Sequence, residues 1–242
     1  MNSNYYIDLV TMDVIKFQGV SIYPISFKEI KETIGYENLS LYMLPFCITK
    51  EYIEYVNNCE LDNSFNLFEE IILKDKDMLE YCSIILGIYC KPEHIYANEK
   101  CITLCDDKDK VIFVLNKDNF DEFSEILLKL NGKSKIKVEK PPKNMSDRQR
   151  DVWEKLQAGR KREEKKNEVY FYDVLNVCEF AGQYRIPISE IENWTIWKIL
   201  NCYNAKLGLK SYDDNLSIGL VTHDLKNIQG NNHWLKKLMI RD

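Results

Sequence analysis

The sequence has few of the residues that build phosphate-binding loops. It contains only 9 glycines and 6 prolines in 242 residues. Neither the spacing G-x-x-x-x-G-K-[ST] nor the spacing G-x-G-x-x-G occurs in it. In both patterns glycine lets the backbone N–H groups approach a phosphate closely. Their absence counts against a P-loop nucleotide site and against a Rossmann dinucleotide site.

Long apolar runs are also missing. No stretch approaches the roughly 18 apolar residues that a membrane-crossing helix requires, and the first residues show no basic segment followed by an apolar one. The net charge of −5 at pH 7 argues against a surface that binds nucleic acid as a whole. These features predict a cytoplasmic protein that has no membrane partner and for which nucleic acid is an unfavoured ligand.

Candidates for catalytic or metal chemistry are sparse. The three histidines, His94, His223 and His233, are far from any pattern typical of a Ser-His-Asp or Cys-His site. Cys101 and Cys105 form a close pair, but on a strand they would lie about 13 Å apart. That separation is too large for one zinc ion unless the chain turns. We therefore predict that the protein is not an enzyme and that it holds neither a metal nor a cofactor.

The cysteines do not suggest a disulfide framework. There are eight of them at scattered spacings, and most stand beside apolar residues. A chain of this length with no evident signal peptide more often keeps such thiols reduced. We expect them to act as small core residues.

Residues 1–132 are predicted to form an α+β domain with a small antiparallel sheet. Residues 5–10 and 14–23 are rich in β-branched and aromatic residues, as are 101–105 and 111–115, and this composition is typical of strands. Apolar residues at helical spacing predict helices that begin near Ser26, Thr49, Ser64, Asp75 and Asn119.

The composition changes after residue 132. Residues 133–167 are dominated by charged residues, with Pro141-Pro142 among them, and are predicted to be a charged linker that holds a helix capped at Ser146. Residues 168–242 regain a core pattern and are predicted to be a small all-α module. Leu207-Gly208 is expected to end one of its helices.

The linker carries a cluster of basic residues. Such residues can bind phosphates, and Trp153 could stack on a base. Acidic residues are interspersed, however, and mixed charge is also typical of a solvated helix with i,i+4 pairs. Three interpretations therefore stay open: a solvated helix, a partner-docking arm, and a nucleic-acid site formed by Arg148, Arg150, Arg160, Lys161 and Arg162.

Three sets of short motifs carry a resemblance to a known family. They are residues 22–30 with 34–36, residues 65–72 with 111–115 and 116–123, and residues 194–197 with 233–238. Together they resemble structural-module proteins of phages and prophages of Gram-positive bacteria. The layout of an N-terminal domain, a charged connector and a small helical C-terminal domain is similar to that of tail assembly chaperones.

This resemblance implies a protein of the host cytoplasm that binds the tape-measure protein and tail-tube proteins during tail morphogenesis. It implies no catalytic residue, because such chaperones act by binding. Aromatic residues of the C-terminal module are the candidates for partner binding: Trp194, Trp197, Tyr203 and Trp234. The alternatives are a structural virion component, such as a tail or baseplate adaptor, and a nucleic-acid-binding regulator; self-association is left open.

Overall fold

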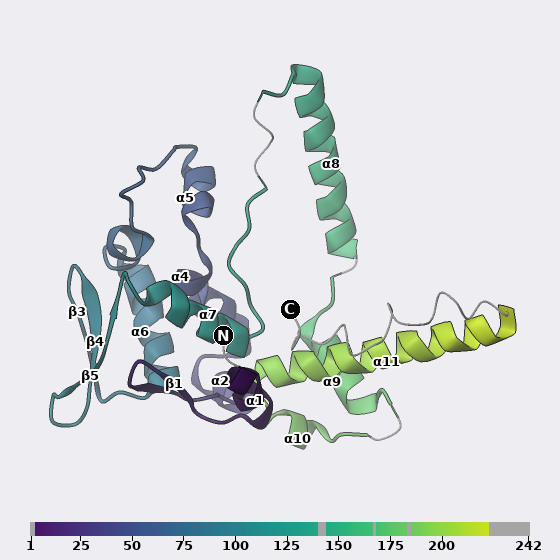
Figure 1. Ribbon diagram of the computed structural model, residues 1–242, viewed down its shortest axis with the longest axis horizontal. Coiled ribbons are helices and arrows are strands. Elements are labelled where there is room, and N and C mark those ends of the chain that lie inside the picture. Colours follow the sequence, from purple (N-terminus) through teal and green to yellow (C-terminus); the bar gives the residue numbers. More distant parts are fainter. Residues whose placement is uncertain (1–2, 140–143, 167, 183–184, 223–242) are drawn as a thin grey trace.

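The computed structural model describes residues 3–139, 144–166, 168–182 and 185–222 (Figure 1). Helices make up most of this part of the chain. Its strands form one sheet of two strands and one of three, both antiparallel. The predicted α+β class is therefore confirmed.

The described chain begins with a helix where a strand was predicted. Residues 5–10 lie in α1 (Ser3–Thr11), which buries Leu9 in the core and leaves Ile7 exposed. The strand prediction rested on β-branched and aromatic composition, which is a weak preference that packing easily overrides. The prediction for residues 5–10 is wrong for that reason.

The hairpin that follows agrees with the sequence. β1 (Ile15–Phe17) pairs with β2 (Val20–Ile22), and the register leaves Gln18 and Gly19 as a two-residue loop. Both loop residues have positive φ, 44° and 92°. Tight hairpin loops favour this backbone because its twist matches that of the strands. The inward-facing residues of both strands are buried.

Helices predicted at Ser26, Thr49 and Asp75 are present as α2 (Phe27–Thr33), α5 (Lys50–Asn57) and α6 (Lys76–Cys90). The helix predicted after Ser64 is only a five-residue π-helical turn, η2 (Phe68–Ile72). Between α2 and α5 lie three short pieces that the apolar spacing did not reveal: η1 (Tyr36–Asn38), α3 (Leu39–Tyr42) and α4 (Leu44–Cys47).

The larger sheet has the order β3-β4-β5. β4 (Cys101–Cys105) and β5 (Val111–Asn116) were predicted, whereas β3 (His94–Ala97) lacks an alternating apolar pattern and was missed. One face of β4 and β5 packs against α7 (Phe120–Leu130) and the hairpin. There the rings of Phe17, Phe113 and Phe123 meet with centroids 5.7–5.9 Å apart.

The C-terminal part contains α9 (Phe171–Phe180), α10 (Ile188–Ile191) and α11 (Ile196–Thr222). The helix predicted to end at Leu207-Gly208 does not end there, because α11 continues through Gly208 to Thr222. An internal glycine costs a helix only about 1 kcal/mol. Ile196 and Trp197 belong to the same core cluster as the hairpin, α6 and α7.

Main-chain hydrogen bonds join the two parts of the chain. The first backbone N–H groups of α2 have no partner inside their own helix. Phe27 donates its N–H to the Trp194 carbonyl and Lys28 to the Glu192 carbonyl, each at 2.8 Å. Lys31 adds an ion pair with the Glu192 carboxylate at 2.7 Å. The segment between α10 and α11 thus caps α2, and the helical module packs onto the α+β part.

The remaining helix, α8 (Asp147–Lys166), rises away from the rest of the ribbon (Figure 1). It begins as predicted at Ser146, whose hydroxyl accepts the Gln149 N–H at 3.4 Å while the Gln149 side chain accepts the Ser146 N–H at 2.8 Å. Of the helices that the structure describes, neither this one nor any other is both long enough and apolar enough to cross a membrane.

The cap of α2 makes a pH-dependent contribution to stability. The Ser26 backbone N–H, 3.0 Å from the Glu29 carboxylate, lowers the pKa of Glu29 below its ordinary value of 4.5, and the Ser26 hydroxyl assists. A depressed pKa means that the carboxylate stabilises the fold above pH 4.5 and loses this effect as the pH falls below it. Glu29→Ala should therefore lower the free energy of unfolding by about 0.5–1 kcal/mol at pH 7.

Urea denaturation at pH 7 and at pH 3 measures this difference. The gap between wild type and Glu29→Ala should shrink at the lower pH. Glu32→Ala, on an exposed residue of the same helix, is the control and should change stability by less than about 0.5 kcal/mol. An equal loss for Glu29→Ala at both pH values would contradict the assignment.

Candidate partner-binding groove

Among the described residues, the aromatic side chains predicted to bind a partner occupy two different environments. Trp197 is only 2% exposed and lies in the main core cluster. Trp194 and Tyr203 are half-buried and pack on a second cluster formed around α9, α10 and α11. Trp234 lies outside the described residues. The structure thus gives Trp197 a core position, and it does not gather these side chains on one open surface.

The predicted basic residues are more accessible. Arg148, Arg150, Arg160, Lys161 and Arg162 are all exposed and all lie on α8. They do not converge on a single patch, because their positions distribute them around the helix. Only Arg160 makes an ion pair that the structure specifies, donating to the Glu139 carboxylate at 2.8 Å.

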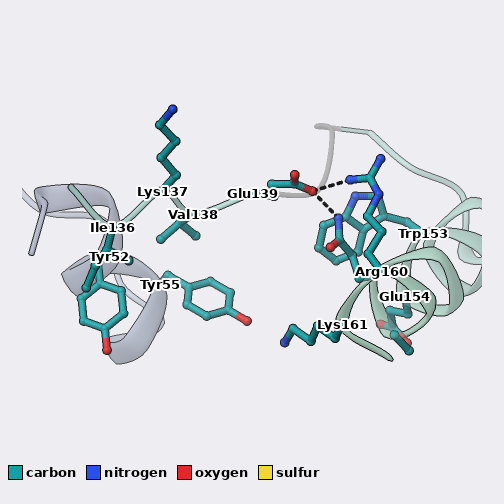
Figure 2. A pocket seen from close by; sticks show the side chains of 12 residues that line it. Tyr52, Tyr55, Ile136, Lys137, Val138, Glu139, Trp153, Glu154, Arg160 and Lys161 are labelled. Carbon is teal, nitrogen blue, oxygen red and sulfur yellow. Dashed lines mark hydrogen bonds and ion pairs between the residues drawn. The ribbon is translucent and has the colours of Figure 1, made fainter. Parts of the chain in front are cut away.

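A hollow of about 510 Å³ lies between α5, α8 and the segment that joins α7 to α8. Figure 2 shows Tyr52 and Tyr55 of α5 on one side and Trp153 and Arg160 of α8 on the other, with residues 136–139 running between them. We call this hollow the aromatic groove; its lining is Tyr52, Tyr55, Ile136, Lys137, Val138, Glu139, Trp153, Glu154, Gln157, Ala158, Arg160 and Lys161.

Backbone hydrogen bonds fix the floor of the aromatic groove to the body of the protein. The N–H of Ile136 donates to the Cys47 carbonyl at 2.7 Å, at the end of α4. The Thr49 hydroxyl donates to the Ile136 carbonyl at 3.3 Å and accepts the Tyr52 N–H at 3.2 Å, as the cap of α5. One threonine therefore sets both the floor and the helix that carries the two tyrosines.

The far wall of the groove is held by Glu139. Its carboxylate accepts hydrogen bonds from the Arg160 guanidinium and from the Gln157 amide, both on α8 (Figure 2). Arg160 and Glu139 are each more than 60% exposed, and exposed ion pairs contribute only about 0–1 kcal/mol. The wall is therefore held by weak contacts, and a bound partner has little to displace.

Exposed apolar side chains flank the aromatic groove. Tyr55 is 58% exposed, and Val56 beside it is equally open. On α8, Val152 is 51% and Leu156 59% exposed. They line a second, shallower hollow of about 330 Å³ with Met145, Arg148, Gln149 and Trp153. Exposed apolar patches of this kind mark binding surfaces for other macromolecules.

Outside the groove, the remaining candidates for chemistry are metal-ligating side chains and cysteine thiols. Within the described ranges, no three His, Cys, Asp or Glu side chains lie close enough to hold a metal ion. All eight cysteines are free thiols, and four are buried: Cys82, Cys90, Cys105 and Cys178. Burial raises the pKa of Cys90 to about 12, which keeps that thiol protonated and unreactive at neutral pH. Cys59, by contrast, is exposed rather than a core residue.

The aromatic groove was not found from the sequence. Tyr52 has the helical spacing of a core residue, and Tyr55 had no role in the pattern. A signal was present in Trp153 and Leu156, two large apolar residues in an otherwise charged segment. That signal did not predict that α5 faces α8, because Tyr52 and Tyr55 lie about 100 positions before Trp153 in the sequence.

Comparison with family models, with curated proteins and with solved structures found no match for this chain. The interpretation of the groove therefore depends on its own residues.

Proposed function

We propose that this chain is a tail-assembly chaperone of a phage or prophage that acts in the host cytoplasm. In this proposal it binds the tape-measure protein and tail-tube proteins during morphogenesis and acts without catalysis. The observation that supports it best is the aromatic groove between α5 and α8, with aromatic side chains on both walls. The part of the proposal that concerns phage tail assembly comes from the sequence resemblance alone.

The groove suits a helical partner on physical grounds. An amphipathic helix binds by laying its apolar face into a hydrophobic groove. Tyrosine and tryptophan supply large contact areas at low entropic cost, because each has few rotatable bonds. Tyr52, Tyr55 and Trp153 provide such rings from two opposite walls (Figure 2). A long helical protein would present many apolar helix faces that could bind in this groove.

Removing the rings should abolish capture of the partner. The double variant Tyr55→Ala/Trp153→Ala, as tagged full-length protein in a phage-infected lysate, should recover at least about tenfold less tape-measure and tail-tube protein than wild type. Quantitative mass spectrometry of the captured proteins measures this. The matched control is Tyr172→Ala/Phe180→Ala, which removes two exposed aromatic side chains of α9 and should leave recovery unchanged.

Two outcomes would contradict the chaperone proposal. Wild type that recovers neither protein would remove the proposed partners. Stoichiometric amounts of this chain in purified phage particles would identify it as a structural virion component, the first alternative. Abundance in lysate together with absence from particles is the expected result.

The second alternative, a nucleic-acid-binding regulator, is favoured by the exposure of all five predicted basic residues on α8. Phosphate contacts make binding fall steeply with salt. An affinity for RNA that drops as salt rises, and that Arg160→Glu/Arg162→Glu weakens, would support this function. Binding that is insensitive to salt would exclude it.

A further inference from the structure

The apolar residues of α8 lie along one side of the helix. Successive residues turn by 100° on a helix, so Val152 and Leu156 fall on one side of α8 with Trp153 beside them, and Met145 lies just before the helix begins. The same four residues line the hollow of about 330 Å³. We call them the apolar stripe; its members within α8, from Val152 to Leu156, span about 6 Å of helix length.

Basic residues border one edge of the apolar stripe. Arg148, Lys155 and Arg162 follow one another at intervals of seven residues, so they form a row along the helix. All three are exposed. Arg160 lies at the opposite edge, next to Trp153, where its charge is paired with the Glu139 carboxylate at 2.8 Å. The positive edge of the apolar stripe is therefore the one formed by the row.

The side of α8 behind the apolar stripe carries mixed charge. Asp147, Asp151 and Glu154 turn away from the stripe, and the basic residues Arg150, Lys161 and Lys165 lie on the same side, so the charges there nearly balance. Glu163 follows in line with Val152 and Leu156, beyond the stripe. The charge that distinguishes the stripe is therefore the basic row along one edge.

From this arrangement we propose that the apolar stripe binds a partner helix whose own apolar face is bordered by Asp and Glu. Residues that flank the apolar seam of two packed helices face each other across it and set partner choice. In an antiparallel pair, a second copy of α8 would place this positive row against itself, and like charges disfavour that contact. A helix with an acidic edge matches the charge of the row. This inference rests on the proposed function and specifies its partner.

Two synthetic helical peptides of about 18 residues test the charge preference directly. They share one Leu/Ile apolar seam and differ only in the residues at its edges, Glu in one and Lys in the other. Fluorescence anisotropy with labelled peptide and full-length protein measures the affinities. The Glu-edged peptide should bind at least about tenfold more tightly than the Lys-edged one, and the difference should fall with added salt.

Charge reversal at the row should reverse that preference. Lys155→Glu/Arg162→Glu should weaken the Glu-edged peptide about tenfold and strengthen the Lys-edged one. The control Arg150→Glu/Lys165→Glu makes the same change in net charge on exposed residues away from the apolar stripe, and it should shift either affinity by less than about twofold. Circular dichroism verifies that both variants keep their helix content.

Each other outcome overturns the inference in a distinguishable way. Equal binding of both peptides removes the acidic preference but leaves a helix-binding surface. Binding of neither removes the apolar stripe as a helix site, while capture of tape-measure protein from lysate still tests the proposed function separately. Tighter binding of a single-stranded RNA than of the Glu-edged peptide, lost in Lys155→Glu/Arg162→Glu, would assign the row to nucleic acid.

Discussion

Replacing Trp197 by alanine is expected to lower the free energy of unfolding by about 3–5 kcal/mol, the cost of removing a fully buried ring from a packed core. Trp197 is 2% exposed and lies in the main core cluster, although it stands in α11, far along the chain from the hairpin and α7. Its loss should therefore destabilise the α+β part together with the helical part. Urea denaturation followed by circular dichroism measures the change.

Trp153→Ala is the matched control, because it removes the same side chain from α8, where it is only half-buried. We expect a loss of less than about 1 kcal/mol there. A small effect of Trp197→Ala on stability, together with loss of partner capture, would return Trp197 to the partner-binding role predicted from the sequence.

Gly132→Ala is expected to destabilise the protein by about 2–4 kcal/mol, through two separate effects. Gly132 has φ +60°, a backbone conformation that a residue with a Cβ adopts only with strain. A Cβ at this position would also overlap the Leu200 Cδ1 atom of α11. The end of the α+β part thus approaches α11 too closely for any side chain.

A double-mutant cycle separates the two effects. Leu200→Ala removes the overlapping group, so Gly132→Ala should cost at least about 1 kcal/mol less in that background than in wild type. Gly87→Ala is the control, because a Cβ at Gly87 meets no atom within 4 Å, and Gly87 is helical. It should leave stability unchanged or raise it by up to about 1 kcal/mol. Additive effects in the cycle would show that Leu200 does not contact residue 132.

Several elements could be predicted because their causes are local. The capping box of Ser26 with Glu29 and the start of α8 at Ser146 depend on residues three positions apart. β4 and β5 follow from short β-branched runs on either side of a polar turn. The wrong predictions concern elements whose structure depends on distant contacts. The apolar residues of α1 fit a strand or a helix equally, and the position of Leu9 in the core selects the helix.

The candidate site likewise has features that the sequence predicted and features that only the tertiary structure revealed. The exposure of the basic residues on a charged helix followed from the scarcity of apolar residues in that segment. The role of the tryptophans did not, because a large aromatic ring serves a core and an interface equally well. Burial distinguishes the two: it places Trp197 inside and leaves Trp153 at the edge of the aromatic groove.

The sequence by itself determined the α+β class, the capped helices and a charged segment that starts a helix at Ser146, since each depends on composition or on residues within a few positions. Only the tertiary structure decided that the segment between α10 and α11 caps α2, that Trp197 is a core residue, and that α5 faces α8 across residues 136–139. Those contacts join segments that are tens to more than 150 residues apart. Spacing along the chain carries no information about which distant surfaces bury each other, because that choice is made by the shape of the whole core.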